Sequence, residues 1–111
     1  MRYSVEDGEL IAKGEWPTTR KGALAESIKK WKWLVKWHFE HPKSGALLAD
    51  SMSCALCNLY IGDDCVDCPV RKCTGQPQCC DTPYFRYAGE KRPLWTRAYA
   101  QAELVFLEGL K

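Results

Sequence analysis

The most constraining feature of this 111-residue sequence is a cluster of seven cysteines, all between Cys54 and Cys80. The cluster contains two C-x-x-C pairs separated by seven residues. Two such pairs in close succession are typical of a tetrahedral site in which thiolates bind one metal ion. Zinc–sulfur bonds of about 2.3 Å place ligand sulfurs roughly 3.8 Å apart, a separation that side chains three positions apart can reach. The sequence therefore predicts a metal site in the middle third of the chain.

We expect this site to bind zinc through thiolates drawn from six candidates. The candidates are Cys54, Cys57, Cys65, Cys68, Cys79 and Cys80. The first four form the two pairs and are the first choice. As alternatives, Cys79 or Cys80 can replace a member of the pairs or join Cys73 in a second, incomplete site. An iron–sulfur cluster is the alternative cofactor, because it also takes four thiolates and often has a proline after one ligand, as Pro69 follows Cys68. His38 and His41 are expected to be surface or packing residues rather than ligands.

Disulfides, buried thiols and a redox pair are the other uses of clustered cysteines. Disulfides form in oxidising compartments, whereas the cysteine count here is odd and the first residues lack the basic cluster and apolar stretch of a secretory signal. We therefore expect a cytoplasmic protein with reduced thiols. A thioredoxin-like redox pair would need a βαβ context, which this sequence does not offer. Inert buried thiols account for one or two cysteines but not for paired motifs.

Apolar periodicity predicts a first helix from about Arg20 to Glu40. Apolar residues recur there at steps of three or four, which is the pattern of one helix face. They are Leu24, Ile28, Trp31, Val35 and Phe39. Thr18 or Thr19 can cap the start of this helix. Pro42 ends it, because the residue before a proline avoids the helical conformation.

Two further helices are expected. One begins near Ser44 and runs towards Tyr60, and the other begins at Pro93, which suits a first turn, and ends near Gly109. The last helix has two neighbouring apolar rows. The first row is Leu94, Ala98, Gln101 and Val105, and the second, stronger row is Trp95, Tyr99, Ala102 and Phe106.

These patterns predict a mainly α-helical fold, a small single domain of two to three helices around a cysteine-rich metal-binding loop. Its parts are an N-terminal arm or hairpin over residues 1–17, two helices over 18–60, the cysteine-rich loop over 61–90 and a C-terminal helix over 91–111. Prolines and glycines are frequent in the loop, so we expect little regular structure there and a metal that orders it. In the N-terminal arm, Glu6-Asp7-Gly8 is a turn-prone sequence.

Lysine and tryptophan residues are interleaved in the first helix, where three of the five tryptophans lie between Trp31 and Trp37. Trp31 belongs to the apolar row, and the opposite side carries the candidate partner-binding residues. These are Lys29, Lys30, Trp33, Lys36 and Trp37. Between residues 20 and 36 there are six basic residues and one acidic residue, so charge is segregated although the net charge of the chain is only +2.

This surface has three interpretations. It can bind an acidic protein, since tryptophan is a frequent hot spot of protein interfaces. It can bind nucleic acid, with bases stacked on the rings and phosphates on the ammonium groups. Alternatively, the third helix or the cysteine-rich loop covers both outer tryptophans, and the lysine stems lie along the rings while their charged ends stay in water.

The cysteine cluster resembles that of small, mostly uncharacterised cysteine-rich proteins of tailed phages and prophages. The similar pattern covers about residues 52–84 and consists of the two C-x-x-C pairs, Pro69-Val70, Thr74-Gly75, Cys79 or Cys80, and Thr82-Pro83-Tyr84. The resemblance implies a bacterial cytoplasmic setting and an accessory role, such as acting on a host or defence protein. It brings no established activity, and it implies that Cys79 or Cys80 is a ligand.

The sequence contains no catalytic signature that we can identify. Phosphate-binding, serine-hydrolase and zinc-protease motifs are missing, as is the H-x-E of zinc deaminases, so we expect that the protein is not an enzyme. No apolar run approaches the roughly 18 residues that cross a bilayer, so no membrane partner is expected. The predicted function is binding of a host or defence protein, with zinc as a structural scaffold. The alternative is a nucleic-acid-binding zinc module that uses the lysine- and tryptophan-rich helix.

Overall fold

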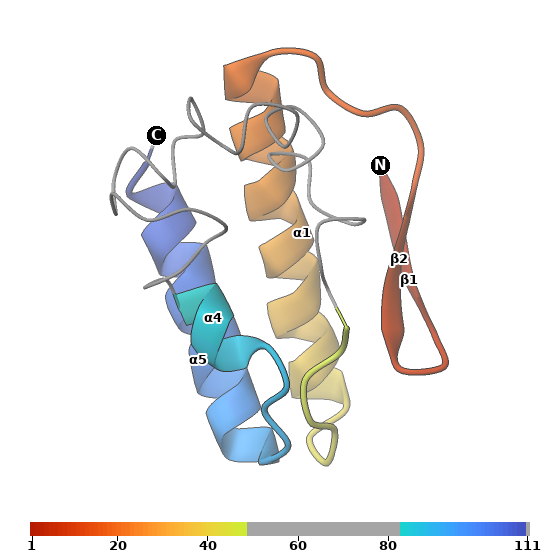
Figure 1. The fold of residues 1–111 in the computed structure, drawn as a ribbon, viewed down its shortest axis with the longest axis vertical. Coiled ribbons are helices and arrows are strands. Elements are labelled where there is room, and N and C mark those ends of the chain that lie inside the picture. The colour runs from red at the N-terminus through yellow and green to blue at the C-terminus, as the bar shows by residue number, and fades with distance from the viewer. Residues whose placement is uncertain (49–82, 111) are drawn as a thin grey trace.

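Two long helices form the centre of the structure. The computed structural model describes residues 1–48 and 83–110. Helices α1 (Arg20–Glu40) and α5 (Pro93–Glu108) contact each other and run in opposite directions (Figure 1). Within the described residues the molecule is small and helix-rich, with one two-stranded sheet, and the first and last predicted helices are both present.

The N-terminal segment forms a hairpin, which is one of the two arrangements expected for it. Strand β1 (Arg2–Glu6) pairs antiparallel with β2 (Glu9–Lys13), and the hairpin lies on the side of α1 away from α5 (Figure 1). Asp7 and Gly8 form the two-residue loop with φ angles of 50° and 77°. Positive φ at both positions suits the twist of a tight hairpin, and glycine adopts it without a steric penalty. The hairpin residues that pack against or join the core are Tyr3, Val5 and Leu10.

Helix α1 begins and ends where the sequence predicts. Thr19 is the N-cap, and its side-chain oxygen accepts a hydrogen bond from the Gly22 amide at 3.0 Å, which satisfies one of the unpaired amides of the first turn. His41 is the C-cap, its amide donates to the carbonyl of Trp37, and Pro42 follows directly.

The buried side of α1 differs from the predicted apolar row. Leu24, Ile28 and Trp31 are buried as expected, but Phe39 is 76% exposed. The buried side also includes polar residues that the row left out: Glu26, Ser27, Lys30 and His38. Because the hairpin packs on one side of α1 and α5 on another, more of the helix circumference is covered than a single apolar row requires.

The predicted second helix is not formed in the part that the structure describes. Residues 44–48 are not helical, and Leu48 forms a parallel bridge to Glu9 at the edge of β2. Three consecutive amides donate to three other elements: Ala46 to the Glu90 carbonyl (2.7 Å), Leu47 to the Tyr87 hydroxyl (3.1 Å) and Leu48 to the Gly8 carbonyl (2.9 Å). These bonds hold the segment across the hairpin and the connection before α5, so it does not begin a helix. The remainder of that prediction, residues 49–60, lies outside the described residues.

The end of the predicted cysteine-rich loop is helical, which corrects the expectation of little regular structure up to residue 90. Residues Pro83–Tyr87 form α4, which packs against α5. Tyr84 and Tyr87 approach the Trp31 ring edge-on, with centroid distances of 5.9 and 5.0 Å. This geometry is favourable between aromatic rings, and it anchors α4 to α1. Residues 61–82 of the predicted loop lie outside the described residues.

Helix α5 has the predicted bounds but a different buried side. Its buried residues are Thr96, Ala100, Glu103 and Leu107. Neither apolar row of the sequence analysis forms this side, since Leu94 is 72%, Trp95 49% and Val105 63% exposed. The side of α5 towards the core therefore contains two polar residues, while much of its apolar surface faces outward.

Candidate functional site

The predicted metal site lies outside the described residues. This applies to all six ligand candidates: Cys54, Cys57, Cys65, Cys68, Cys79 and Cys80. Among residues 1–48 and 83–110, no group of three or more histidine, cysteine or carboxylate side chains is arranged to hold a metal ion. Zinc and the iron–sulfur alternative therefore remain predictions from the spacing of the cysteines.

The structure separates the five predicted partner-binding residues. Lys29 and Lys36 are exposed, and Trp33 and Trp37 are half-buried. Lys30 is corrected, because it is only 2% exposed and its ammonium group lies 5.5 Å from the centroid of the Trp31 ring. Position 30 belongs to the buried side of α1, and the aliphatic stem of lysine allows it to pack in an interior.

The two outer tryptophans already have aromatic neighbours within the fold. The Trp33 ring packs at a tilt against Tyr3 of β1, with a centroid distance of 6.1 Å. The Trp37 ring is stacked on the His41 ring at 4.1 Å and 16°. In one of the three interpretations the third helix or the cysteine-rich loop covers these rings, whereas these ring contacts, among the described residues, come from the hairpin and from the residue after α1. These rings are therefore less available to stack on a ligand.

A buried polar cluster joins the end of α1 to α4. His38 is fully buried, and its Nε2 lies 2.8 Å from the hydroxyl of Tyr87, which also accepts the amide of Leu47. Burial lowers the pKa of His38 from 6.5 to about 4, with smaller effects of the same sign from His41 and Arg97. Burial also raises the pKa of Tyr87 to about 12, partly opposed by the hydrogen bond from Leu47. Both side chains are neutral at pH 7, and their hydrogen bonds join α1, α4 and the segment that contains Leu47.

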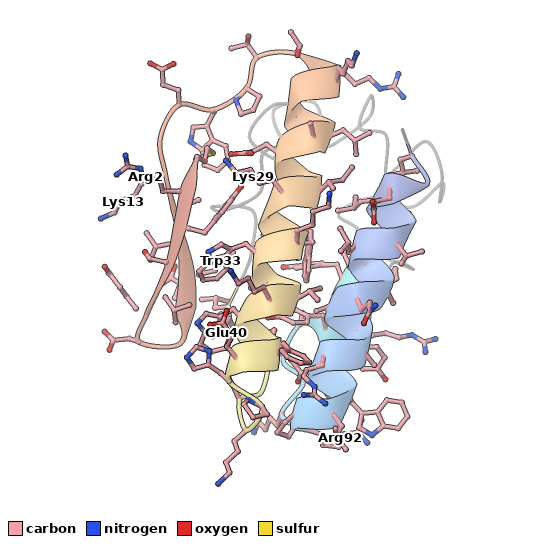
Figure 2. The ribbon with its side chains drawn as sticks, turned by 180° about the vertical axis from the view of Figure 1, so that it is seen from behind. Arg2, Lys13, Lys29, Trp33, Glu40 and Arg92 are labelled. Carbon is pink, nitrogen blue, oxygen red and sulfur yellow. The ribbon has the colours of Figure 1, made fainter. Side chains whose placement is uncertain are left out.

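Five exposed cations lie on the hairpin and on α1. They are Arg2, Lys13, Lys29, Lys32 and Lys36. Arg2 and Lys13 lie directly opposite each other in the strand register. Lys29 donates a hydrogen bond to the carbonyl of Met1 at 3.1 Å and lies between α1 and the hairpin, whereas Arg2 and Lys13 point to the side of the hairpin away from α1 (Figure 2).

Three of these cations, Arg2, Lys13 and Lys32, are not among the partner-binding residues predicted from the sequence. The sequence does contain a signal for Arg2 and Lys13, because a two-residue loop at Asp7-Gly8 fixes which residues of the two strands lie opposite each other. Lys32 lies three residues after Lys29 and four before Lys36, which is the spacing of one helix side.

A second candidate surface is the outward side of α5, which we call the α5 apolar face. It consists of Leu94, Trp95, Ala98, Ala102 and Val105, all exposed. Its N-terminal end carries a short charged group. Arg92 binds both carboxylate oxygens of Glu90 at 2.9 and 3.0 Å, and its guanidinium lies 5.0 Å from the centroid of the Trp95 ring. The hydrogen bonds from Arg92 lower the pKa of Glu90 to about 2, so this carboxylate stays ionised.

Comparisons with protein families, curated proteins and solved structures find no match to this chain. None of the helices that the structure describes is long and apolar enough to cross a membrane.

Proposed function

We propose that this protein is a non-catalytic binding module that acts by binding another protein, with zinc as the scaffold of its cysteine-rich segment. The observation that supports protein binding is the α5 apolar face, on which Leu94 is 72% and Val105 63% exposed. A helix that directs such residues to water while it buries Thr96 and Glu103 is arranged for a partner rather than for its own core.

The composition of this face fits a protein partner. Trp95 is 49% exposed, and tryptophan and arginine are the residues most enriched in interface hot spots. The small side chains Ala98 and Ala102 leave room for close approach of another backbone. Lys91 and Arg92 lie at one end, so the partner expected here has an apolar groove bordered by carboxylates.

The cysteine spacing supports the zinc part of this proposal. Tetrahedral thiolate binding can supply folding free energy on the order of 10 kcal/mol, which is comparable to the whole stability of a small domain. The resemblance to phage and prophage proteins supports a host or defence protein of a bacterium as the partner class. Under this proposal the protein acts stoichiometrically in the bacterial cytoplasm.

The binding proposal is tested by affinity capture from bacterial cytoplasm with quantification of the captured proteins. We expect one partner in stoichiometric amount, retained at high salt, and loss of that partner in Leu94→Ser/Val105→Ser. The matched control is Phe39→Ser, which changes an apolar residue that is 76% exposed on α1 and should keep the partner. The absence of a stoichiometric partner, or equal capture by the α5 variant, would reject the proposal.

The zinc proposal is tested by elemental analysis of the purified protein, followed by chelation. We expect about one zinc per chain, a colourless solution, and disorder of at least residues 54–85 after strong chelation or in Cys57→Ser, followed by hydrogen exchange. Iron with a visible absorption band would instead support the iron–sulfur alternative. An unchanged exchange pattern after metal removal would exclude a structural role for the metal.

A further inference from the structure

The α5 apolar face has large side chains at both ends and small ones between them. Leu94 and Trp95 lie near the start of the helix and Val105 lies near its end, all three exposed, and the alanines lie in the middle at Ala98 and Ala102. With a rise of about 1.5 Å per residue, the two alanines lie about 3 Å on either side of the centre of the face. Trp95 and Val105 lie about 7.5 Å on either side of the same centre. The face is therefore arranged evenly about its middle.

Such a face is complementary to a second copy of itself in the antiparallel direction. A two-fold axis through the centre places Leu94 and Trp95 of one copy at the level of Val105 of the other. The same axis brings the alanines of the two copies together. Helix axes can approach to about 8 Å where the side chains between them are small, so the alanines allow the large side chains at both ends to make contact.

The charges at the two ends of the face favour the same direction. Lys91 directly precedes the first turn of α5, Glu108 is its last residue, and both are exposed. An antiparallel pair brings Lys91 of each copy near Glu108 of the other, whereas a parallel pair would bring like charges together. Arg92 is held by Glu90 of its own chain, so Lys91 is the cation at this end that can reach a second copy.

The position of α5 leaves this face open to a second copy. Helices α1 and α4 contact α5 on its inner side, and the hairpin lies beyond α1, at the opposite edge of the described fold (Figure 1). Leu94 is 72% and Val105 63% exposed in the single chain. An exposed apolar surface of this kind is stabilised when another surface covers it.

We propose that the α5 apolar face joins two copies of this chain in an antiparallel, two-fold symmetric dimer. The biological role of this dimer rests on the proposed function, because the face that joins the copies is the face that binds the partner protein. The dimer covers the face in the free protein, and the partner displaces the second copy. Binding of the partner and formation of the dimer therefore exclude each other.

The first experiment measures the dimer dissociation constant of the full chain by sedimentation equilibrium, with a reductant present so that disulfides between chains do not contribute. Wild type should be a dimer. Ala98→Arg should weaken it about 30-fold or more, because two arginines then enter the closest part of the interface. The matched control is Ala25→Arg, the same change at an exposed position of α1, which should leave the dissociation constant unchanged. Circular dichroism confirms that both variants are folded.

The second experiment tests the antiparallel direction by exchange of charge. Lys91→Glu and Glu108→Lys should each weaken the dimer about 10-fold, because each creates two like-charge pairs in a symmetric dimer. An equal mixture of the two variants should form a mixed dimer about as tight as the wild type, since every pair then has opposite charges.

Three outcomes would overturn the dimer proposal: a wild type that stays monomeric at the highest concentration measured, equal dimerisation by Ala98→Arg and Ala25→Arg, or no recovery in the mixture of charge variants. Failure of the proposed function gives a different result, namely a dimer for which no stoichiometric partner is captured. A monomer that captures its partner through α5 would reject the dimer and leave the proposed function standing.

Discussion

The two long helices present opposite chemistry to solvent. The exposed side of α1 carries Lys29, Lys32 and Lys36, whereas that of α5 carries leucine, tryptophan, alanine and valine. Both helices nevertheless bury polar side chains, with Lys30 and His38 on α1 and Thr96 and Glu103 on α5. The difference shows that the most apolar row of a helix is not always its buried one.

The strongest test of this comparison uses the same substitution on two sides of α5. Leu107→Ala should lower the free energy of unfolding by about 3 to 4 kcal/mol, because the side chain is 3% exposed and its removal leaves a cavity. Leu94→Ala should change it by less than about 0.5 kcal/mol, because that side chain is 72% exposed. Urea unfolding followed by circular dichroism measures both changes. Equal losses of stability in the two variants would mean that α5 presents a different side to the core.

The buried polar groups of α1 predict a pH dependence. The unfolded state protonates His38 near pH 6.5, whereas the folded state resists protonation down to about pH 4. The free energy of unfolding therefore has its full value above pH 6.5 and falls as the pH is lowered. At pH 4 the contribution of His38 has reduced it by about 3 kcal/mol. Urea unfolding between pH 4.5 and 7 measures the slope, and His38→Gln should lose most of it. An equally steep slope in that variant would assign the effect to other groups.

Removal of one hydroxyl tests the contact between α1 and α4. In Tyr87→Phe, both the Leu47 amide and His38 Nε2 lose their partner in the interior. We expect a loss of about 2 kcal/mol in the free energy of unfolding, since a buried unsatisfied group is more costly than an average hydrogen bond is favourable. Tyr99→Phe is the control, because Tyr99 is half-buried and its hydroxyl makes no hydrogen bond to another described residue, so its effect should be close to zero.

The smallest expected effect is a gain in stability. Arg2→Glu replaces a like-charge pair with an opposite-charge pair across the strands and should stabilise the protein by about 0.5 kcal/mol. Arg2→Gln should give about half of that gain, since it removes the repulsion only. Thermal unfolding at low salt resolves such differences, and destabilisation by both substitutions would show that the Arg2 side chain is held by favourable contacts.

The parts of the fold that the sequence predicts are those set by local chemistry. Thr19 and Pro42 define α1, Pro93 and Gly109 define α5, and Asp7-Gly8 makes the hairpin turn. In each case a capping group, a fixed φ angle or a permitted positive φ acts within a few residues. Such signals do not depend on the rest of the fold.

The sequence predictions that are wrong concern residues whose structure depends on contacts with distant segments of the chain. Ser44 and the leucines after it have a helical pattern, but amides of this segment bind the hairpin and the residues before α5. Gly45 allows this approach, because a Cβ there would lie 3.0 Å from the carbonyl oxygens of Glu90 and Lys91. Lys30 is buried although its charge favours the surface, and the sequence of α1 alone does not indicate which segments cover it.

The two described parts of the chain end at Leu48 and begin again at Pro83. Leu48 is fixed by two backbone hydrogen bonds to the hairpin, Tyr84 packs against Trp31, and Leu48 and Tyr84 line the same cavity. The two ends of the cysteine-rich connection are therefore held close together by the described fold, so the zinc ion proposed above would not have to supply the entropy of joining them. Under that proposal, the edge of the hairpin and α4 adjoin the connection directly, and changes at these two elements would report whether metal is bound.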